Sequence, residues 1–378
     1  MRRSLVLLAL IAALPTVAAA QPAPAAPVAA DAPPAAAPAG PPALAATDEA
    51  PASTVSPDSP WLDLAPARAL QLSTKADAPG NHKLASALTL GGLYAGFTTW
   101  TYFAWYRKHK PLEQFRFGCF FCDGKDGNYE LWNRNGWFGS HRYAGGADKL
   151  GHAWANLGLT RAGVEILNQW GGYDRTASIW ISGALSELLF FGVEIKDGFY
   201  YEFSFGDLTF NTLGVALGMA MSAWPRVDDL LDFRVQYWPS DAYRAQFTEG
   251  NTGKNLNIAE DYSGETYLLA LHLGGIPRLR QSRVGAWTRY IDVVAGFGSR
   301  GYKPEPPAGA EPYKERQHMF LGLSLNAQGV FDALLEGRSR PARKITHGLF
   351  EVMNLPFTTL PVLEHSQSPS SPADGGGA

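Results

Sequence analysis

Seven polar side chains stand in an otherwise apolar stretch of the chain, and their types are those of metal or acid/base chemistry. Ionisable groups are costly to place among apolar residues, so each needs a partner, a ligand or a function. Converging Asp, His and Glu side chains can bind a divalent metal ion and activate a water molecule. They can equally form a general acid/base pair in which burial raises one carboxyl pKa. The seven residues are Asp148, His152, Glu187, Glu194, Asp197, Asp207 and Asn211.

The spacing of these residues predicts a polar stripe on each of three helices. Asp148 and His152 are four residues apart and so share one helix face, and Asp207 and Asn211 repeat that spacing. The helix between them carries two glutamates seven residues apart and an aspartate one turn later. Because polar groups avoid an apolar exterior, the stripes should converge inward. If a metal ion is bound, the expected ligands are Asp148, His152, Glu187 and Asp207.

A purely structural role for the same residues is the alternative. Asp148 follows a Gly-Gly-Ala turn and can cap its helix, and Ser204 with Asp207 fits a capping box. His152 can simply donate a hydrogen bond to a carboxylate. The set has neither the H-E-x-x-H spacing of zinc proteases nor a serine nucleophile elbow. The sequence therefore leaves a structural or ligand-orienting network and a catalytic or metal site both open, and it identifies no cofactor.

Long apolar segments must position these side chains. Three helices are predicted, from about residue 148 to Gly171-Gly172, from about residue 177 onwards, and from residue 205 to Pro225. Short Gly-rich joints between them imply antiparallel neighbours. A fourth segment, 84–106, carries no charge, ends in aromatic residues beside RKHK and is long enough to cross a bilayer. A buried central helix is the other interpretation of that segment.

The pattern changes beyond Pro225 to short β-prone runs separated by turn residues. These runs are FRVQYW, ETYLLALHLGG, YIDVVAGFG and HMFLGLSLNAQGVF, and an amphipathic stretch, ITHGLFEVMNL, follows. We therefore predict an α+β protein, mainly a helical bundle of about four apolar helices followed by a small antiparallel β-sheet, with disordered N- and C-terminal tails.

The composition divides the chain into five parts. The start, MRRSLVLLALIAALPTVAAA, has the basic, apolar and small-residue regions of a secretory signal, and its apolar run is shorter than a spanning helix needs. The Ala/Pro-rich stretch after it cannot bury a core. The predicted parts are a signal peptide (1–20), a disordered linker (21–57), the helical bundle (58–225) with an aromatic loop (107–147), a β-rich part (226–362) and a disordered tail (363–378).

Charge and aromatic content point to an apolar partner. The chain has 32 basic and 35 acidic residues, a net charge of −3, without the clustered Lys and Arg that nucleic-acid binding requires. Charged residues make up only 18% of it, and it contains 11 tryptophans, which favours contact with lipid or an apolar ligand. We expect a membrane lipid or an envelope component as the partner, and no nucleic acid.

The two cysteines are separated by two phenylalanines, as Cys119-Phe-Phe-Cys122. In an exported chain such a pair can form a local disulfide, a redox pair or half of a zinc site. A redox pair normally follows a strand and opens a helix, whereas this pair lies in a stretch with loop character. A zinc site would need further ligands, and there is no second cysteine pair. We therefore expect a disulfide between Cys119 and Cys122.

Several short motifs follow one another in a set order. They are Asp148-Lys149-x-x-His152, Glu187, Glu194-x-x-Asp197-Gly198, Phe203-Ser204-x-x-Asp207 and Asn211-x-x-Gly214, then Asp261-Tyr262-x-Gly264-x-Thr266-Tyr267, residues 295–298 and Leu321-x-Leu323-Ser324-Leu325. Over about residues 81–328 this order resembles the YfiM-like domain-of-unknown-function family of envelope proteins, many of them predicted lipoproteins. The helical part more loosely resembles VanZ-like membrane proteins. The chain departs from the lipoprotein pattern because no cysteine follows its N-terminal apolar run.

Two functions are consistent with these observations. The favoured one is an exported, membrane-associated envelope protein with a non-catalytic lipid- or partner-binding role. The alternative is a metal-dependent or acid/base hydrolase or transferase acting on a lipid-linked or phosphate-bearing envelope substrate. In both cases we expect a periplasm-facing protein associated with the inner or the outer membrane of the envelope.

Overall fold

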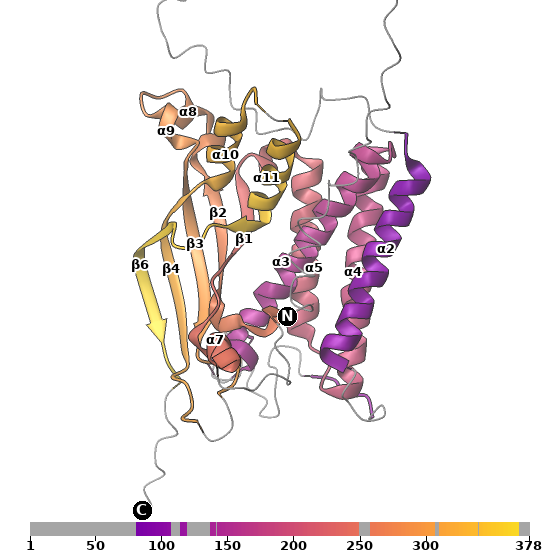
Figure 1. The fold of residues 1–378 in the computed structure, drawn as a ribbon, viewed down its shortest axis with the longest axis vertical. Coiled ribbons are helices and arrows are strands. Elements are labelled where there is room, and N and C mark those ends of the chain that lie inside the picture. The colour runs from indigo at the N-terminus through magenta and orange to yellow at the C-terminus, as the bar shows by residue number, and fades with distance from the viewer. Residues whose placement is uncertain are drawn as a thin grey trace, which may run out of the picture.

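The computed structural model describes residues 81–106, 114–118, 137–140, 142–248, 258–306, 310–338 and 340–369. Within these residues the chain is α+β, as the sequence predicts, with a group of long helices followed by a six-stranded sheet (Figure 1). The predicted signal peptide and linker, the cysteine pair Cys119 and Cys122, and much of the aromatic loop lie outside the described residues.

Four long helices form the first part of the fold. The side chain of Asp174 caps α4 by accepting a hydrogen bond from the Ala177 amide, and Ser204 caps α5 by accepting one from the Asp207 amide at 3.1 Å. Helix α3 ends at Val164, and the chain continues as a π-helical turn, 165–170, up to Gly171. The helices are α2 (Lys83–Thr101), α3 (Ala147–Val164), α4 (Arg175–Tyr200) and α5 (Phe205–Ala223).

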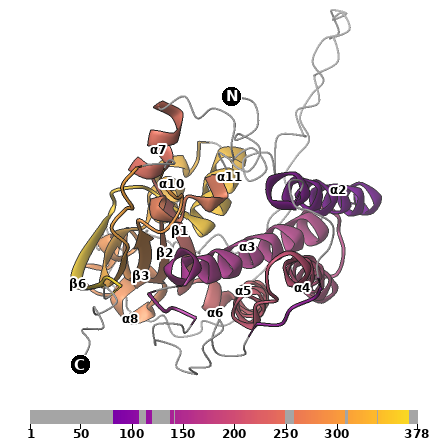
Figure 2. The same ribbon diagram turned by 90° about the horizontal axis from the view of Figure 1, so that it is seen from below.

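Helix α3 is the central element, because it contacts α4, α5 and the sheet (Figure 2). It packs especially closely against α5. A Cβ atom placed on Gly214 of α5 would lie 2.1 Å from the carbonyl oxygen of Ala153, so only glycine permits this approach of the two backbones. This contact brings the polar residues of α5 next to those of α3.

The sheet has the strand order β5-β1-β2-β3-β4-β6. It is not the small, purely antiparallel sheet that the sequence predicts, because β5 pairs parallel to β1 at the edge. That two-residue strand follows a helix and is too short to leave a pattern in the sequence. The strands are β1 (Leu231–Tyr237), β2 (Glu265–His272), β3 (Ile291–Arg300), β4 (Arg316–Leu325), β5 (Met353–Asn354) and β6 (Thr359–Gln367).

Strand β6 extends beyond residue 363, where the composition suggests that a disordered tail begins. Its pairing with β4 continues to Gln367, which lies opposite Gln317. Leu360 and Leu363 on this strand are 64% and 66% exposed. The backbone hydrogen bonds of a sheet therefore order a segment whose side chains bury little surface, and composition does not report such pairing.

The two faces of the sheet are covered differently. One face carries Phe233, Tyr267 and Phe297, which pack with residues of α3 in the largest apolar core. On the other face Leu268 and Val294 are buried, and α10 and α11 lie over this part of the sheet (Figure 1). The shorter helices are α6 (Pro225–Asp228), α7 (Asp241–Thr248), α8 (Pro277–Arg280), α9 (Gly285–Thr288), α10 (Ala327–Leu335) and α11 (Arg340–Val352).

Large apolar side chains are exposed on α2 and α4. Leu84 and Leu88 of α2 are 74% and 67% exposed, and Trp180 and Leu188 of α4 are 66% and 64% exposed. Among the described helices, length and composition would allow α4 to cross a membrane, although core helices of soluble proteins pass the same test. The charge-free segment 84–106 does not meet this test, and its α-helical part ends at Thr101.

Candidate functional site

Side chains from three helices meet around His152. The Nδ1 atom of His152 on α3 lies 3.5 Å from Glu194 Oε1 on α4 and 2.9 Å from Asn211 Oδ1 on α5. One ligand atom each of His152, Glu194 and Asp207 lies within 4.8 Å of the other two. We call the His152 cluster the set of Asp148, Lys149, His152, Glu194, Asp207 and Asn211.

A chain of amide groups fixes how Asn211 faces His152. The Nδ2 group of Asn156 donates to Asn211 Oδ1 at 2.7 Å, and Ser186 Oγ donates to Asn156 Oδ1 at 2.8 Å. The Nδ2 group of Asn211 in turn donates to Glu194 Oε1 at 3.3 Å. The oxygen of Asn211 is therefore held towards the imidazole, where it accepts a hydrogen bond from Nδ1 and orients the ring.

Lys149 is the buried cation of the His152 cluster. Its Nζ atom lies 3.3 Å from Asp207 Oδ1 and 3.6 Å from Asp148 Oδ2, and its side chain is 1% exposed. The other oxygen of Asp148, Oδ1, has no hydrogen-bond partner among the described residues. The cluster therefore brings three carboxyl groups together around the ammonium group of Lys149.

Burial, together with the mutual repulsion of the carboxyl groups, perturbs their pKa values. Burial raises the pKa of Asp148 to about 7 and that of Glu194 well above its ordinary value. Burial also acts to raise the pKa of Asp207, but Lys149 and His152 outweigh it and hold this pKa below its usual range. Carboxyl groups shifted in opposite directions within one cluster are typical of functional sites.

Two of the seven polar residues singled out from the sequence, Asp197 and Glu187, lie outside the His152 cluster. Asp197 accepts a hydrogen bond from the Tyr106 hydroxyl at 2.5 Å, and burial raises its pKa to about 6. Glu187 accepts one from Thr212 at 2.9 Å. Glu187 shares a helix face with Glu194, but seven residues place it about 10 Å further along the axis.

The predicted metal-ligand set is therefore not the one that the fold brings together. Glu194 takes the place expected of Glu187, and Asp148 pairs with Lys149. Helical spacing identifies the face on which a side chain lies, but it does not give the level at which neighbouring helices meet.

A buried histidine, His272, lies in the sheet, and no motif in the sequence singles it out. Nε2 of His272 lies 2.9 Å from Asp232 Oδ2, and Nδ1 lies 2.8 Å from Asp292 Oδ1. Arg234 contacts both carboxylates, at 2.8 Å for Asp292, and Asn326 lies 2.9 Å from His272 Nδ1. We call these five residues the His272 network.

The His272 network is balanced in charge. Two carboxylates face one guanidinium and one protonated imidazole, the imidazolium of His272. Burial lowers the pKa of His272, but the two aspartates outweigh it and raise this pKa to about 9. Burial likewise acts to raise the pKa of Asp232, and Arg234 and His272 instead bring it to about 2. The signal in the sequence was the spacing of Asp232 and Arg234. Residues two apart in a strand lie on the same face of the sheet, so the spacing places both charges side by side.

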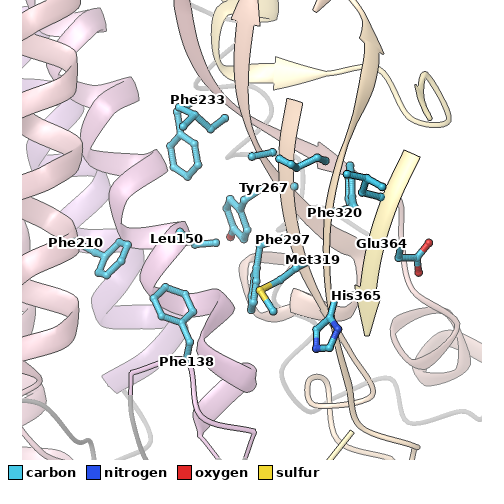
Figure 3. A pocket seen from close by; sticks show the side chains of 15 residues that line it. Phe138, Leu150, Phe210, Phe233, Tyr267, Phe297, Met319, Phe320, Glu364 and His365 are labelled. Carbon is cyan, nitrogen blue, oxygen red and sulfur yellow. The ribbon is translucent and has the colours of Figure 1, made fainter. Parts of the chain in front are cut away.

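An apolar groove of about 620 Å³ lies between the helices and the sheet. Figure 3 shows aromatic side chains of both parts pointing into it. Leu150 of α3 lines the groove, whereas His152, two positions along, points to the side of α4. The lining residues are Phe138, Leu150, Phe210, Phe233, Tyr267, Leu269, Ala295, Gly296, Phe297, Met319, Phe320, Leu321, Leu363, Glu364 and His365.

Comparison with known families gives one match. A family described as "Predicted periplasmic lipoprotein (DUF2279)" matches residues 134–223. This span contains α3, α4 and α5 and every residue of the His152 cluster. No curated protein sequence and no solved structure matches the chain.

The fold and this match define the class of protein. It is an exported α+β protein that faces the periplasm and is associated with the membrane of the cell envelope. The chain is similar over these residues to predicted periplasmic lipoproteins, which agrees with the envelope family inferred from the motifs. The match does not bear on the YfiM-like or VanZ-like names, and it lends no support to an enzymatic activity.

Proposed function

We propose that this protein is a non-catalytic envelope protein that binds the acyl chain of a membrane lipid in the apolar groove. The observation that carries the proposal is the groove itself. Ligand pockets in proteins measure some 300–1,000 Å³ and are lined mainly by apolar and aromatic side chains. The groove has a volume of about 620 Å³, and only two of its lining residues, Glu364 and His365, carry ionisable groups other than tyrosine.

The groove continues onto an exposed apolar strip of the sheet. Leu269 on β2, Leu321 on β4 and Leu363 on β6 are 45%, 52% and 66% exposed, and they line the groove. With β3 between β2 and β4, these strands span about 14 Å at ~4.8 Å per strand. An exposed apolar surface of this extent is costly in water and marks a binding site for lipid or another apolar partner.

The surroundings favour a lipid over a soluble apolar ligand. The protein is associated with the envelope membrane, as the matched family indicates. Exposed apolar residues on α4, Trp180 and Leu188, give it a further surface suited to lipid contact. His365 offers a polar group to a headgroup where β6 borders the groove (Figure 3), whereas Glu364 is paired with His318 at 2.9 Å.

Transfer of a pyrene-labelled phosphatidylglycerol from vesicles to the purified full chain tests the proposal. Leu321→Asp places a charge in the groove, and Ala295→Trp fills it, so both variants should lose at least about tenfold in affinity. Leu88→Asp is the matched control, since Leu88 is 67% exposed on α2, away from the groove. Native mass spectrometry should show one lipid bound to the wild type and to this control.

Two results would overturn the proposal. One is a wild-type chain that takes up no lipid at vesicle concentrations that load known carriers. The other is an equal loss of binding in Leu88→Asp and Leu321→Asp, which would assign lipid contact to the general apolar surface and not to the groove.

A further inference from the structure

We propose that His152, Glu194 and Asp207 form a binding site for one divalent transition-metal ion, separate from the apolar groove. The site joins α3, α4 and α5, the helices that span residues 147–223. It lies on the side of α3 that faces α4, whereas the groove lies on the side that faces the sheet.

The geometry of the three side chains suits a metal ion. Their ligand atoms lie within 4.8 Å of one another. Because Nδ1 of His152 donates to Asn211 Oδ1, Nε2 is the ring nitrogen that would bind the ion. Ligands about 2.0–2.1 Å from a tetrahedral zinc ion stand about 3.4 Å apart. Small rotamer adjustments of His152 and Asp207 would close the set, and solvent or a ligand would fill the fourth position.

The charge of the cluster calls for a cation. Lys149 contacts Asp148 and Asp207, while the contacts of Glu194 are with the Asn211 amide and the His152 ring. Glu194 is 1% exposed, and a buried carboxylate without a cation is strongly disfavoured. Arg142 adds positive charge further out, on the side of Asp148 and Asp207.

The shell around the three ligands is already ordered. Asn211 orients the imidazole, and Asn156 and Ser186 hold Asn211 in place. Partners of this kind fix ligand geometry in known metal sites and contribute to affinity. The site also has an access route, because the side chains of His152 and Asp207 are 20% and 14% exposed.

The donor set selects among metals. One imidazole with two carboxylates suits zinc and neighbouring transition metals, whereas magnesium prefers oxygen ligands alone and keeps its water. We therefore expect the site to bind Zn²⁺ and Co²⁺ and to discriminate against Mg²⁺.

Titration of the metal-free full chain with Zn²⁺ and Co²⁺ tests this inference. The wild type should bind one ion, gain thermal stability with Zn²⁺ and not with Mg²⁺, and give a Co²⁺ absorption spectrum typical of low coordination number. Glu194→Gln and His152→Gln should weaken binding at least about tenfold, because loss of a direct ligand costs no less than loss of a second-shell partner.

Glu187→Gln on the same helix is the matched control. Glu187 is the ligand that helical spacing alone would choose, and it lies outside the group that could share an ion. This variant should bind the metal like the wild type. If His152→Gln fails to fold, Glu194→Gln decides the matter, because glutamine retains the oxygen that accepts from Asn211.

Three outcomes would overturn the inference. They are a wild type that binds no stoichiometric Zn²⁺, a Zn²⁺-induced rise in melting temperature that persists in Glu194→Gln, and equal loss of binding in Glu187→Gln and Glu194→Gln. Lipid transfer into the groove is measured independently, so failure of the metal site leaves the proposed function untouched.

Discussion

Two histidines of the described residues, His152 and His272, each face a pair of carboxyl groups, and their surroundings differ. His272 in the sheet lies between two aspartates with Arg234 beside them, so that two negative and two positive groups balance. His152 between the helices faces Glu194 and Asp207, and Lys149 is the single ammonium group for three carboxylates. The His272 side chain is 7% exposed, whereas that of His152 is 20% exposed.

This difference separates a structural network from a site that can bind a ligand. Where every charge has a partner and solvent is excluded, the groups stabilise one arrangement and have no capacity left for another molecule. Where buried carboxyl groups outnumber the cations beside them and one side is open to solvent, binding of a proton or a metal ion stabilises the site.

The largest effect is expected from Arg234→Met in the His272 network. The substitution leaves Asp232 and Asp292 buried with His272 as their one cation. Breaking a buried ion pair in this way lowers the free energy of unfolding by about 3–5 kcal/mol. Urea denaturation measures the change, with Arg244→Met as control, because the Arg244–Asp241 pair is exposed and should contribute within about 0.5 kcal/mol. An equal loss in the free energy of unfolding for both variants would contradict a structural role of the network.

The pH dependence of the free energy of unfolding should reveal the contribution of protonated His272. Its folded-state pKa of about 9 lies above the ordinary value of 6.5. The stabilisation is therefore complete below about pH 6.5 and is lost as the pH rises through 9, to a total of about 3 kcal/mol. Urea midpoints of the wild type and His272→Gln between pH 6 and 9.5 measure this loss, and an identical slope in both chains would contradict it.

Gly214→Ala should disturb the His152 cluster through the backbone. The added Cβ would lie 2.1 Å from the Ala153 carbonyl oxygen, so α3 and α5 must separate. We expect a loss of about 1–3 kcal/mol, together with loss of the rise in melting temperature that Zn²⁺ produces. Gly192→Ala on α4 meets no atom within 4 Å and should gain up to about 1 kcal/mol. Metal binding that survives Gly214→Ala would show that this close approach does not position the ligands.

The smallest effect is expected from Glu194→Gln in metal-free solution. The substitution removes the ionisable carboxyl group and keeps the oxygen that accepts from Asn211. The free energy of unfolding should stay the same or rise by about 1 kcal/mol. Thermal and urea denaturation measure it. A loss of more than about 2 kcal/mol would mean that Glu194 is balanced by groups around it, as Asp292 is, and the contrast between the two histidines would disappear.

The predictability of the fold differed between its two parts. The helices around the polar residues begin and end close to where their caps and glycines indicate, since Ser204 caps α5 and Gly171 follows the π-helical turn after α3. The β-prone runs correspond to β1, β2, β3 and β4. The short strand β5 and the course of β6 to Gln367 depend on pairing with distant strands, which leaves no local pattern.

The candidate site was predictable in its residue types but not in its membership. Spacing placed His152, Asp207 and Asn211 on inward faces, and the fold brings them together. It could not choose between Glu187 and Glu194, because both share a face and the choice depends on the level at which α4 meets α3. The His272 network was missed because its charges come from separate strands, and only the register of the sheet places Asp292 opposite His272.

The α+β class, the export of the chain, and the helix faces that carry acid, base and amide groups can all be inferred from local sequence patterns. These properties depend on composition and on periods of 3.6 and 2 residues, which act locally. Which side chains meet, which charges are balanced and where an apolar groove opens depend instead on the tertiary fold. Those outcomes depend on the backbone approach at Gly214, the relative height of three helices and the register of six strands, because such contacts join residues far apart in the chain.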